Sequence, residues 1–139
     1  MQVLSRVTRL ARHLDRRRGA AFSAHGLEPW EFDVLAALRR AGAPYQLSPG
    51  QLIRETMVTS GTMTNRVDRL SARGLVARED HPHDRRGVLV ILTPRGRRTV
   101  DSALADLLLA EHAILAALPI AEREHLVLAL RQLLTPYDT

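Results

Sequence analysis

Apolar residues recur at helical spacing along most of the chain, and short alternating runs interrupt this pattern near its middle. An apolar stripe with a period of about 3.6 residues indicates an amphipathic helix, whereas alternation indicates a strand. Helices are expected over residues 1–24, 27–41, 49–57, 60–73, 94–118 and 121–134. Strands are expected over residues 75–80 and 88–92, and residues 45–47 could pair with them as a third. The chain should therefore be mainly α-helical with a small β wing.

Capping residues divide the central part of the chain into a helix-turn-helix. Ser48 provides a hydroxyl cap for the helix that follows. Pro49 occupies its first position, where the missing proline N–H would have no helical partner in any case. Thr59 or Ser60 begins the next helix, and Gly74 supplies the left-handed residue that ends it. Two helices joined by so short a connection must cross steeply. Because a hairpin with a charged tip follows them, the predicted fold is a winged helix.

The second helix of this pair has the composition of a DNA-recognition helix. Met63, Val67 and Leu70 form one buried stripe, so the polar side chains lie on its other faces. Hydroxyl, amide and guanidinium groups can reach base edges and phosphates in a major groove. The candidate DNA contacts here are Ser48, Thr59, Ser60, Thr62, Thr64, Asn65 and Arg69. Two alternatives stay open: Thr59 and Ser60 act only as caps, or the unit is an ordinary α+β packing unit with solvated arginines.

Basic charge is concentrated away from the C-terminal part of the chain. Residues 1–53 hold 8 Arg and 4 acids, residues 54–98 hold 10 Arg and 5 acids, and residues 99–139 hold 2 Arg and 6 acids. The three segments therefore carry net charges of +4, +5 and −4. A basic centre beside an acidic tail indicates an electrostatic footprint for DNA. Every basic residue is Arg, whose planar fork suits phosphate and guanine, although genome base composition explains most of this bias.

The chain lacks the residues that several classes of function require. The chain has no Cys, which excludes disulfides, thiolate nucleophiles and Cys metal sites. The sequence contains no nucleophile elbow, P-loop or zincin motif, so we expect no enzyme and no cofactor. His81 and His83 beside Asp80 and Asp84 could bind a divalent cation, but one short cluster at a hairpin tip is weak support for a metal site. Without a long apolar run or a signal-peptide pattern, we expect a cytoplasmic protein that does not enter a membrane.

Both ends of the chain carry apolar stripes that the winged unit is too small to cover. Pairing these ends across a twofold axis would bury them and would set two recognition helices about one helical turn of DNA apart. We expect a homodimer with an N-terminal dimerisation helix over 1–26, a winged helix-turn-helix domain over 27–98 and C-terminal dimerisation helices over 99–139. The alternatives are a monomeric bundle and, for the basic first helix, a place on a membrane surface.

Four segments closely resemble the MarR family of bacterial transcriptional regulators: LEPWEFDVLAALRRAG, LSPGQL, TSGTMTNRVDRLSARGLV and HPHDRRGVLVILTPRG. The resemblance extends from Leu4 to Leu134. It implies a homodimeric winged-helix protein that binds double-stranded DNA, usually a repressor that a small ligand releases from its operator. It also implies that Arg86 enters the minor groove and that Asp84 holds its guanidinium, with a solvated turn as the alternative. Arg85 is either a phosphate contact or a solvated charge.

Two segments, WEFDVLAALRR and SGTMTNRVDRL, look most like the urate-responsive branch of this family. Asp33, Arg66 and Arg78 match the positions at which that branch binds an anionic ligand, which implies urate or another organic acid as effector. Asp33 lies in an apolar run, so we expect it to be partly buried and to need a partner. The alternative is a structural ion pair between Asp33 and Arg66 without any ligand.

The chain departs from the family pattern at three points. His81 replaces the first Asp of the wing motif, and Glu28 stands where a better helix cap is common. The urate-responsive branch has an additional N-terminal segment with a ligand-contacting Trp, which this sequence begins too late to contain, and Trp30 stands elsewhere. The rival function from another class is a small-molecule-binding or protein-interaction module whose basic face serves a partner other than DNA.

Overall fold

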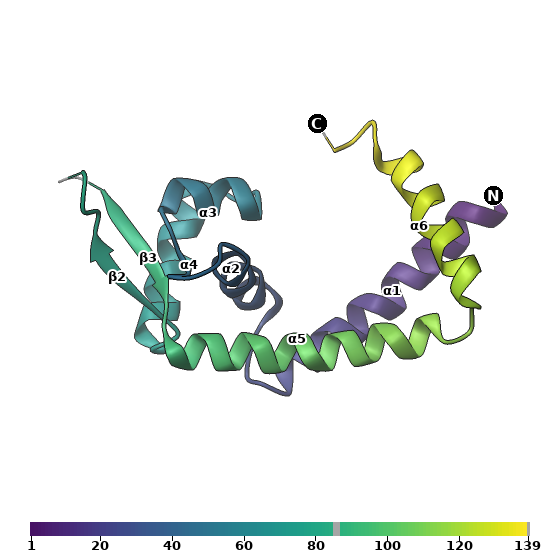
Figure 1. Ribbon diagram of the computed structural model, residues 1–139, viewed down its shortest axis with the longest axis horizontal. Helices are drawn as coiled ribbons and strands as arrows, with labels where there is room; N and C mark the ends of the chain where they lie inside the picture. Colours follow the sequence, from purple (N-terminus) through teal and green to yellow (C-terminus); the bar gives the residue numbers. More distant parts are fainter. Residues whose placement is uncertain (85–86, 139) are drawn as a thin grey trace.

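The chain forms a lobe and an arm that share one long helix (Figure 1). The computed structural model describes residues 1–84 and 87–138. In chain order, its elements are α1 (Gln2–Ser23), α2 (Pro29–Arg40), β1 (Gln46–Leu47), α3 (Pro49–Thr56), α4 (Ser60–Ala72), β2 (Val76–Asp80), β3 (Val88–Leu92), α5 (Pro94–Leu115) and α6 (Ile120–Leu134). This order confirms the predicted class, a mainly helical chain with a small β wing.

The lobe is a winged helix made of α2, α3, α4 and an antiparallel sheet with the strand order β1-β3-β2. β2 and β3 form the hairpin, in which Arg78 lies opposite Val90. Gln46 pairs with Ile91 across the β1–β3 edge, which confirms the predicted third strand. Because successive residues of a strand face opposite sides, Val90 enters the core while Ile91 stays half-buried.

The predicted helix starts are confirmed by their caps. Ser48 Oγ accepts the Gln51 N–H at 3.2 Å, and Gln51 Oε1 accepts the Ser48 N–H at 2.8 Å. At the start of α4, Thr59 Oγ1 accepts the Thr62 N–H at 3.3 Å. Gly74 follows α4 with φ +71°, a conformation that favours glycine because a side chain would be strained there. Local chemistry thus sets the bounds of both helices of the helix-turn-helix.

One core joins the lobe to the two helices that flank it. Phe22 of α1 stacks on Phe32 of α2 with ring centroids 4.1 Å apart. Val100 of α5 is buried in the same cluster. The other large side chains that are fully buried are Val34, Leu35, Leu38, Leu52, Met63, Leu70 and Val90. The apolar packing therefore extends across residues 26 and 98, where the domain boundaries were expected.

The start of α5 lies against the end of α4. Thr93 Oγ1 donates to the Gly74 carbonyl at 2.7 Å and accepts the Gly96 N–H at 3.0 Å. A Cβ at Gly96 would lie 2.0 Å from the Leu75 carbonyl oxygen, so only glycine fits at this close approach. This contact fixes the direction of α5 relative to the last turn of α4.

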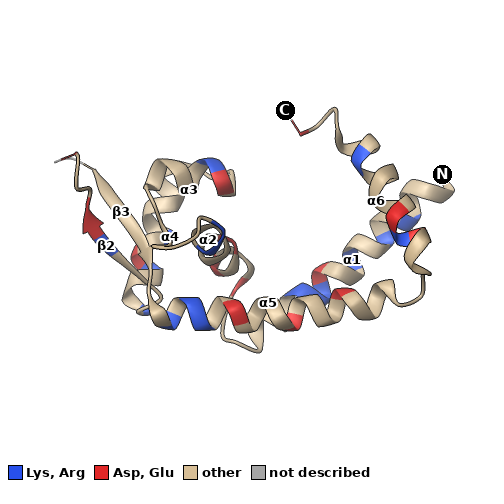
Figure 2. Ribbon diagram, viewed as in Figure 1, with Lys and Arg blue, Asp and Glu red and all other residues tan. Residues whose placement is uncertain are grey.

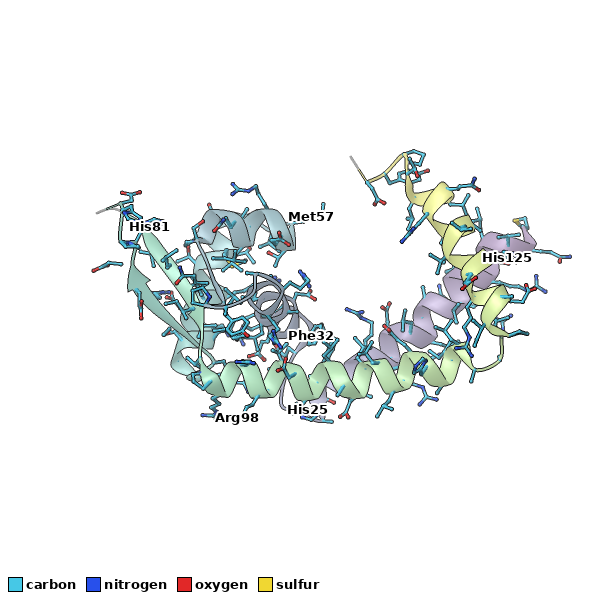
Figure 3. The ribbon with its side chains drawn as sticks, viewed as in Figure 1. His25, Phe32, Met57, His81, Arg98 and His125 are labelled. Atoms are coloured by element: carbon cyan, nitrogen blue, oxygen red, sulfur yellow. The ribbon has the colours of Figure 1, made fainter. Side chains whose placement is uncertain are left out.

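Two polar contacts tie the lobe to α5 further along that helix. Arg39 Nε on α2 donates to Asp101 Oδ1 at 2.8 Å, and this hydrogen bond raises the pKa of the Arg39 guanidinium above its ordinary value. In the α1–α2 connection, His25 Nε2 lies 2.6 Å from Asp106 Oδ2 (Figure 3). Both contacts join residues far apart in the sequence, and together they hold α5 along the lobe.

The arm consists of α1, the outer part of α5, and α6 (Figure 1). Helix α5 ends at Leu115 and not near Leu118 as predicted, and the Leu118 N–H instead closes a turn on the Leu115 carbonyl at 3.0 Å. Because Leu118 precedes Pro119, the helical conformation is disfavoured there. Among the described residues, no single helix is long and apolar enough to span a membrane; α5 and α6 meet that test only as a pair, bent by 106°.

Large apolar side chains remain exposed along this arm. Every residue of α6 is exposed or half-buried. The exposed residues are Val3, Leu4, Val7 and Leu10 on α1, Leu104, Leu108 and Leu109 on α5, and Ile120, Val127, Leu128, Leu130, Leu133 and Leu134 on α6. Between the three helices lies an apolar recess of about 200 Å³. A single copy of the chain thus leaves the apolar stripes of its arm in contact with water.

Candidate nucleic-acid interface

Helix α4 turns an apolar face inward and a polar edge outward. Met63, Val67 and Leu70 are at most 3% exposed, which confirms the predicted stripe. The polar side chains predicted on this helix are all exposed: Ser60, Thr62, Thr64, Asn65 and Arg69. A helix that is held by its apolar face and presents amide, hydroxyl and guanidinium groups can form hydrogen bonds with base edges.

Two of the predicted contacts lie at helix N-termini, where they act as caps. Ser48 is half-buried at the start of α3, and Thr59 is exposed at the start of α4. Thr59 Oγ1 also donates to Thr62 Oγ1 at 2.9 Å. Free N–H groups at a helix start favour a phosphate, so capping and a phosphate contact are compatible here. The turn between the two helices carries Met57, which is 91% exposed at the end of α3 (Figure 3).

The β2–β3 hairpin forms the wing at one side of the lobe (Figure 1). Asp84 is exposed near its tip, where the Gly87 N–H donates to the Asp84 carbonyl at 3.0 Å. The predicted contacts Arg85 and Arg86 lie outside the described residues. Within residues 1–84 and 87–138, no group of three or more His, Cys, Asp or Glu could hold a metal ion.

A cleft of about 440 Å³ lies between the start of α2 and α4. Trp30 supplies its α2 side, and Arg66 and Arg69 are among the α4 residues that line it. The guanidinium carbon of Arg69 lies 4.8 Å from the centre of the indole ring, and that of Arg66 lies 5.5 Å from it. These are cation–π distances, so one aromatic ring holds two cations beside the polar edge of α4.

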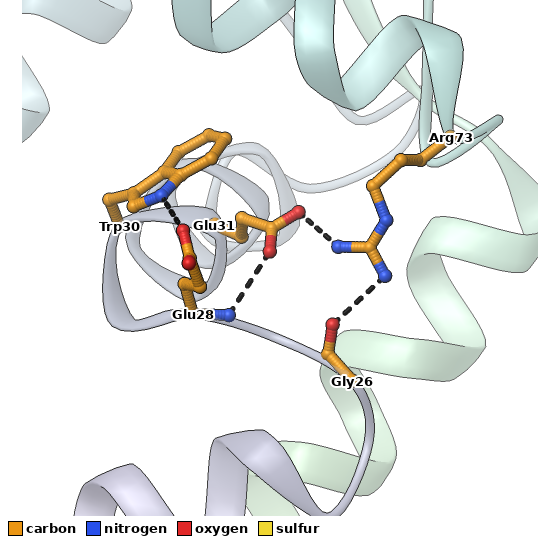
Figure 4. A network of polar contacts seen from close by, with 5 residues as sticks. All are labelled: Gly26, Glu28, Trp30, Glu31 and Arg73. Atoms are coloured by element: carbon orange, nitrogen blue, oxygen red, sulfur yellow. Dashed lines mark hydrogen bonds and ion pairs between the residues drawn. The ribbon is translucent and has the colours of Figure 1, made fainter.

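A polar network fixes the end of α4 to the start of α2 (Figure 4). The Glu31 side chain is 5% exposed and pairs with Arg73 Nη1, while its other oxygen accepts the Glu28 N–H at 3.1 Å. Arg73 Nη2 donates to the Gly26 carbonyl at 2.9 Å. Glu28 Oε2 accepts the Trp30 indole N–H. One buried carboxylate therefore caps α2 and holds the residue that follows α4.

The structure does not bring the three expected ligand contacts together. Asp33 is exposed, so the expectation that it is partly buried is wrong. Arg66 lies over Trp30. Arg78 pairs with Asp68 and lines a separate recess of about 150 Å³. Among the described residues, no ion pair joins Asp33 to Arg66, which was the structural alternative.

The position of Asp33 follows from the geometry of α2. The buried face of this helix carries Glu31, Val34, Leu35 and Leu38, which follow one another at steps of three, one and three residues. Asp33 lies on the opposite side of the turn, since each residue advances the helix by about 100°. The i, i+3, i+4 spacing that begins at Glu31 could have revealed that Glu31 is the buried carboxylate of α2. The apolar neighbours of Asp33, Phe32 and Val34, instead suggested that Asp33 is the buried one.

Charge is distributed as the sequence predicted. Figure 2 shows arginines at the start of α5 and along α1, and acidic residues further along α5 and on α6. Arg97 at the start of α5 lies 4.8 Å from the centre of the Tyr45 ring. The arginines at the start of α5 lie beside the lobe, whereas those of α1 lie on the arm. Positive charge on the lobe favours an electrostatic attraction to DNA.

A recognition helix held by its apolar face, with an antiparallel wing beside it, defines a winged-helix DNA-binding protein. Residues 25–87 match the model of the MarR family. The chain is 36% identical over 126 residues to the HTH-type transcriptional regulator PecS of Dickeya dadantii (strain 3937), covering 91% of this chain and 76% of PecS. The chain belongs to the MarR family of transcriptional regulators, in the branch that includes PecS.

Solved structures agree with this assignment. A mutant of MarR from E. coli in complex with operator DNA has 28% sequence identity and a TM-score of 0.76, covering 94% of this chain and 93% of that chain. BpsR from Bordetella bronchiseptica, whose DNA binding is regulated by 6-hydroxynicotinic acid, has 32% identity and a TM-score of 0.68, covering 92% of this chain and 98% of that chain. The protein is therefore a DNA-binding transcriptional regulator and not an enzyme.

Replacement of Arg73 by Ala should destabilise the fold, because it removes the cation that faces the buried Glu31 carboxylate. We expect the free energy of unfolding to fall by about 2–3 kcal/mol, less than for a fully buried pair, since Arg73 is 42% exposed. Urea denaturation at one fixed protein concentration measures the change. The matched control is Arg40→Ala, which breaks the exposed pair with Glu55 at 3.7 Å and should cost less than about 1 kcal/mol. Equal small losses in both variants would contradict the prediction.

Proposed function

We propose that the protein acts as a homodimer that binds a pseudo-palindromic operator and represses transcription, and that a small organic anion relieves this repression. The observation that carries the DNA part is the exposed polar edge of α4 behind its buried Met63–Leu70 stripe. Two such helices about one helical turn apart would enter successive major grooves on one face of a duplex. A repressor of this kind acts where the chromosome lies, so we propose that it works in the cytoplasm.

The proposed DNA contacts divide into three kinds. Asn65 and Arg69 read base edges, because their amide and guanidinium groups match the donors and acceptors of adenine and guanine. Arg86, held by Asp84, enters the minor groove, where a narrow A·T segment concentrates negative potential. The remaining residues contact phosphates or flank the bases: Ser48, Thr59, Ser60, Thr62, Thr64 and Arg85.

A duplex that carries the upstream region of the protein's own gene should bind more tightly than a scrambled duplex. Its affinity should fall log-linearly as the salt concentration rises, because counterions are released on binding.

Replacing Asn65 by Ala should cost about 1–3 kcal/mol of binding free energy on the operator and relax sequence specificity. Arg86→Ala should weaken binding and lower the slope of log affinity against log salt by about one. Fluorescence anisotropy of labelled duplexes measures each of these effects. Arg131→Ala on α6 removes the same charge far from α4 and should bind as the parent does. Equal affinity for operator and scrambled duplexes would rule out a sequence-specific regulator.

The exposed apolar side chains of the arm support the homodimer. Helix α6 has no face that the rest of the same chain covers fully, and an isolated helix of this length is marginal in water. Pairing the arms of two copies would bury these stripes. We therefore propose that residues 1–26 and 99–139 form the dimerisation region, and that residues 27–98 bind DNA.

An acidic residue in place of Leu130 should separate the dimer. Leu130→Asp places a charge in the apolar face of α6, and an unpaired charge is costly in an apolar interface. We expect the dimer dissociation constant to rise by at least about tenfold. Sedimentation equilibrium measures it. The matched control is Met57→Asp, which adds the same charge at an exposed apolar residue of the lobe and should leave the mass at twice that of the chain. A parent protein that sediments as a monomer would overturn the homodimer.

Regulation by an organic anion is supported by Arg66. Its guanidinium lines the cleft beside Trp30, and the described residues give it no ion pair. BpsR, whose DNA binding 6-hydroxynicotinic acid regulates, is a relative of the same fold. Arg78 and Asp33 complete the proposed ligand set, and their present separation means that they reach one anion only after a rearrangement. An effector of this kind acts by binding the two states of the protein with different affinities.

Urate or 6-hydroxynicotinate should raise the melting temperature of the protein and release it from its operator. A ligand at 100 times its dissociation constant stabilises the folded state by about 2.7 kcal/mol, which differential scanning fluorimetry detects readily. Arg66→Ala should abolish both effects, because it removes the cation that faces the anion. Arg54→Ala on α3, the same change at an exposed arginine outside the cleft, should respond as the parent does. A parent that shows no shift with either anion would exclude them as effectors.

A further inference from the structure

We propose that Trp30, which lies outside the recognition helix, is a positioning residue for DNA recognition: its indole ring orders the Arg69 guanidinium before DNA arrives. The inference rests on the proposed role of Arg69 as a DNA contact. It gives α2, which lies outside the helix-turn-helix, an indirect part in DNA recognition.

The geometry of the stack leaves the guanidinium ready to bind. Its carbon lies 4.8 Å from the centre of the indole ring, so the cation is held through its flat face. A guanidinium carries its N–H donors around its rim, and these stay available when the face is occupied. Among the described residues, no carboxylate pairs with Arg69, and its side chain is exposed. An arginine without an ion pair, held in one place at the polar edge of α4, is prepared for a phosphate or a base edge.

The ring is itself held from two sides. Trp30 is half-buried against the core, and its indole N–H donates to Glu28 Oε2. Glu28 lies at the start of α2, which the buried Glu31 carboxylate caps, and Arg73 binds that carboxylate from the end of α4 (Figure 4). The ring beneath Arg69 is therefore fixed to the end of the helix that carries Arg69, and the two can separate only if the Glu31–Arg73 ion pair breaks.

Order in the free protein has a direct effect on affinity. An arginine side chain loses much conformational freedom when DNA fixes it. Where a ring has already restricted the side chain, the loss on binding is smaller, and affinity rises without any new contact to DNA. Trp30 would thus act through Arg69 and would not itself touch a base.

The first test is a double-mutant cycle on operator DNA. Trp30→Leu should weaken operator binding about two- to fivefold, the factor that an exposed cation–π contact corresponds to. In the Arg69→Ala background, Trp30→Leu should cause a smaller further loss, because the side chain that the ring positions is absent. Trp30→Phe, which keeps an aromatic face, should recover part of the affinity. The salt slope of Trp30→Leu should equal that of the parent, since no charge is removed.

Tyr45→Leu is the matched control. Tyr45 holds Arg39 and Arg97 at 5.1 and 4.8 Å from its ring centre, so this variant removes a similar stack away from α4. It should leave operator affinity unchanged. All variants are compared at a temperature at which thermal melting shows each to be folded. Equal losses from Trp30→Leu with and without Arg69, or no loss in either background, would overturn the inference while leaving the DNA-binding function intact. If Arg69→Ala binds the operator as the parent does, the contact proposed for Arg69 is wrong, and the role of Trp30 is wrong with it.

The second test needs no DNA. Trp30 is the only Trp of the chain, so all tryptophan emission reports on this ring. Arg69→Ala uncovers part of the indole and should increase acrylamide quenching of its emission, whereas Arg131→Ala on α6 should not. Quenching that is the same in the parent and in Arg69→Ala would show that the stack does not form in solution, and would overturn the inference.

Discussion

The ion pair between Glu31 and Arg73 constrains where the recognition helix can lie. Glu31 is 4% exposed, and a carboxylate buried to that extent needs a cation beside it. Arg73 follows the last residue of α4, so the pair joins the end of that helix to the start of α2. The same guanidinium also binds the Gly26 carbonyl in the α1–α2 connection. One arginine therefore sets the position of α4 against two other elements of the lobe.

The end of α4 is also held from its other side. Thr93 binds the Gly74 carbonyl, and Gly96 approaches the Leu75 carbonyl so closely that no side chain fits between them. Helix α5 begins at this contact and continues into the arm. Both contacts act on the same end of α4, so they fix the direction of α5 relative to the recognition helix.

The arginines of the lobe differ in what they contact. Arg39, Arg73 and Arg78 each pair with a carboxylate, and so they contribute to the packing of elements. Arg66 and Arg69 have no such partner among the described residues and rest instead on Trp30. A cation over an aromatic face keeps its N–H donors free. Arg66 and Arg69 thus place positive charge without a carboxylate partner along the outward edge of α4.

The sequence by itself determined the elements of this protein, because helix starts, helix ends and apolar stripes depend on residues close together in the chain. Ser48 and Thr59 as caps, Gly74 as a helix end, and the Met63–Leu70 stripe were all predictable from spacing alone. Only the tertiary structure decided which side chains of different elements meet. The pair between Glu31 and Arg73 and the stacking of Arg69 on Trp30 depend on the angle at which α2 crosses α4. Packing of the whole core sets that angle, and no local pattern in the sequence specifies it.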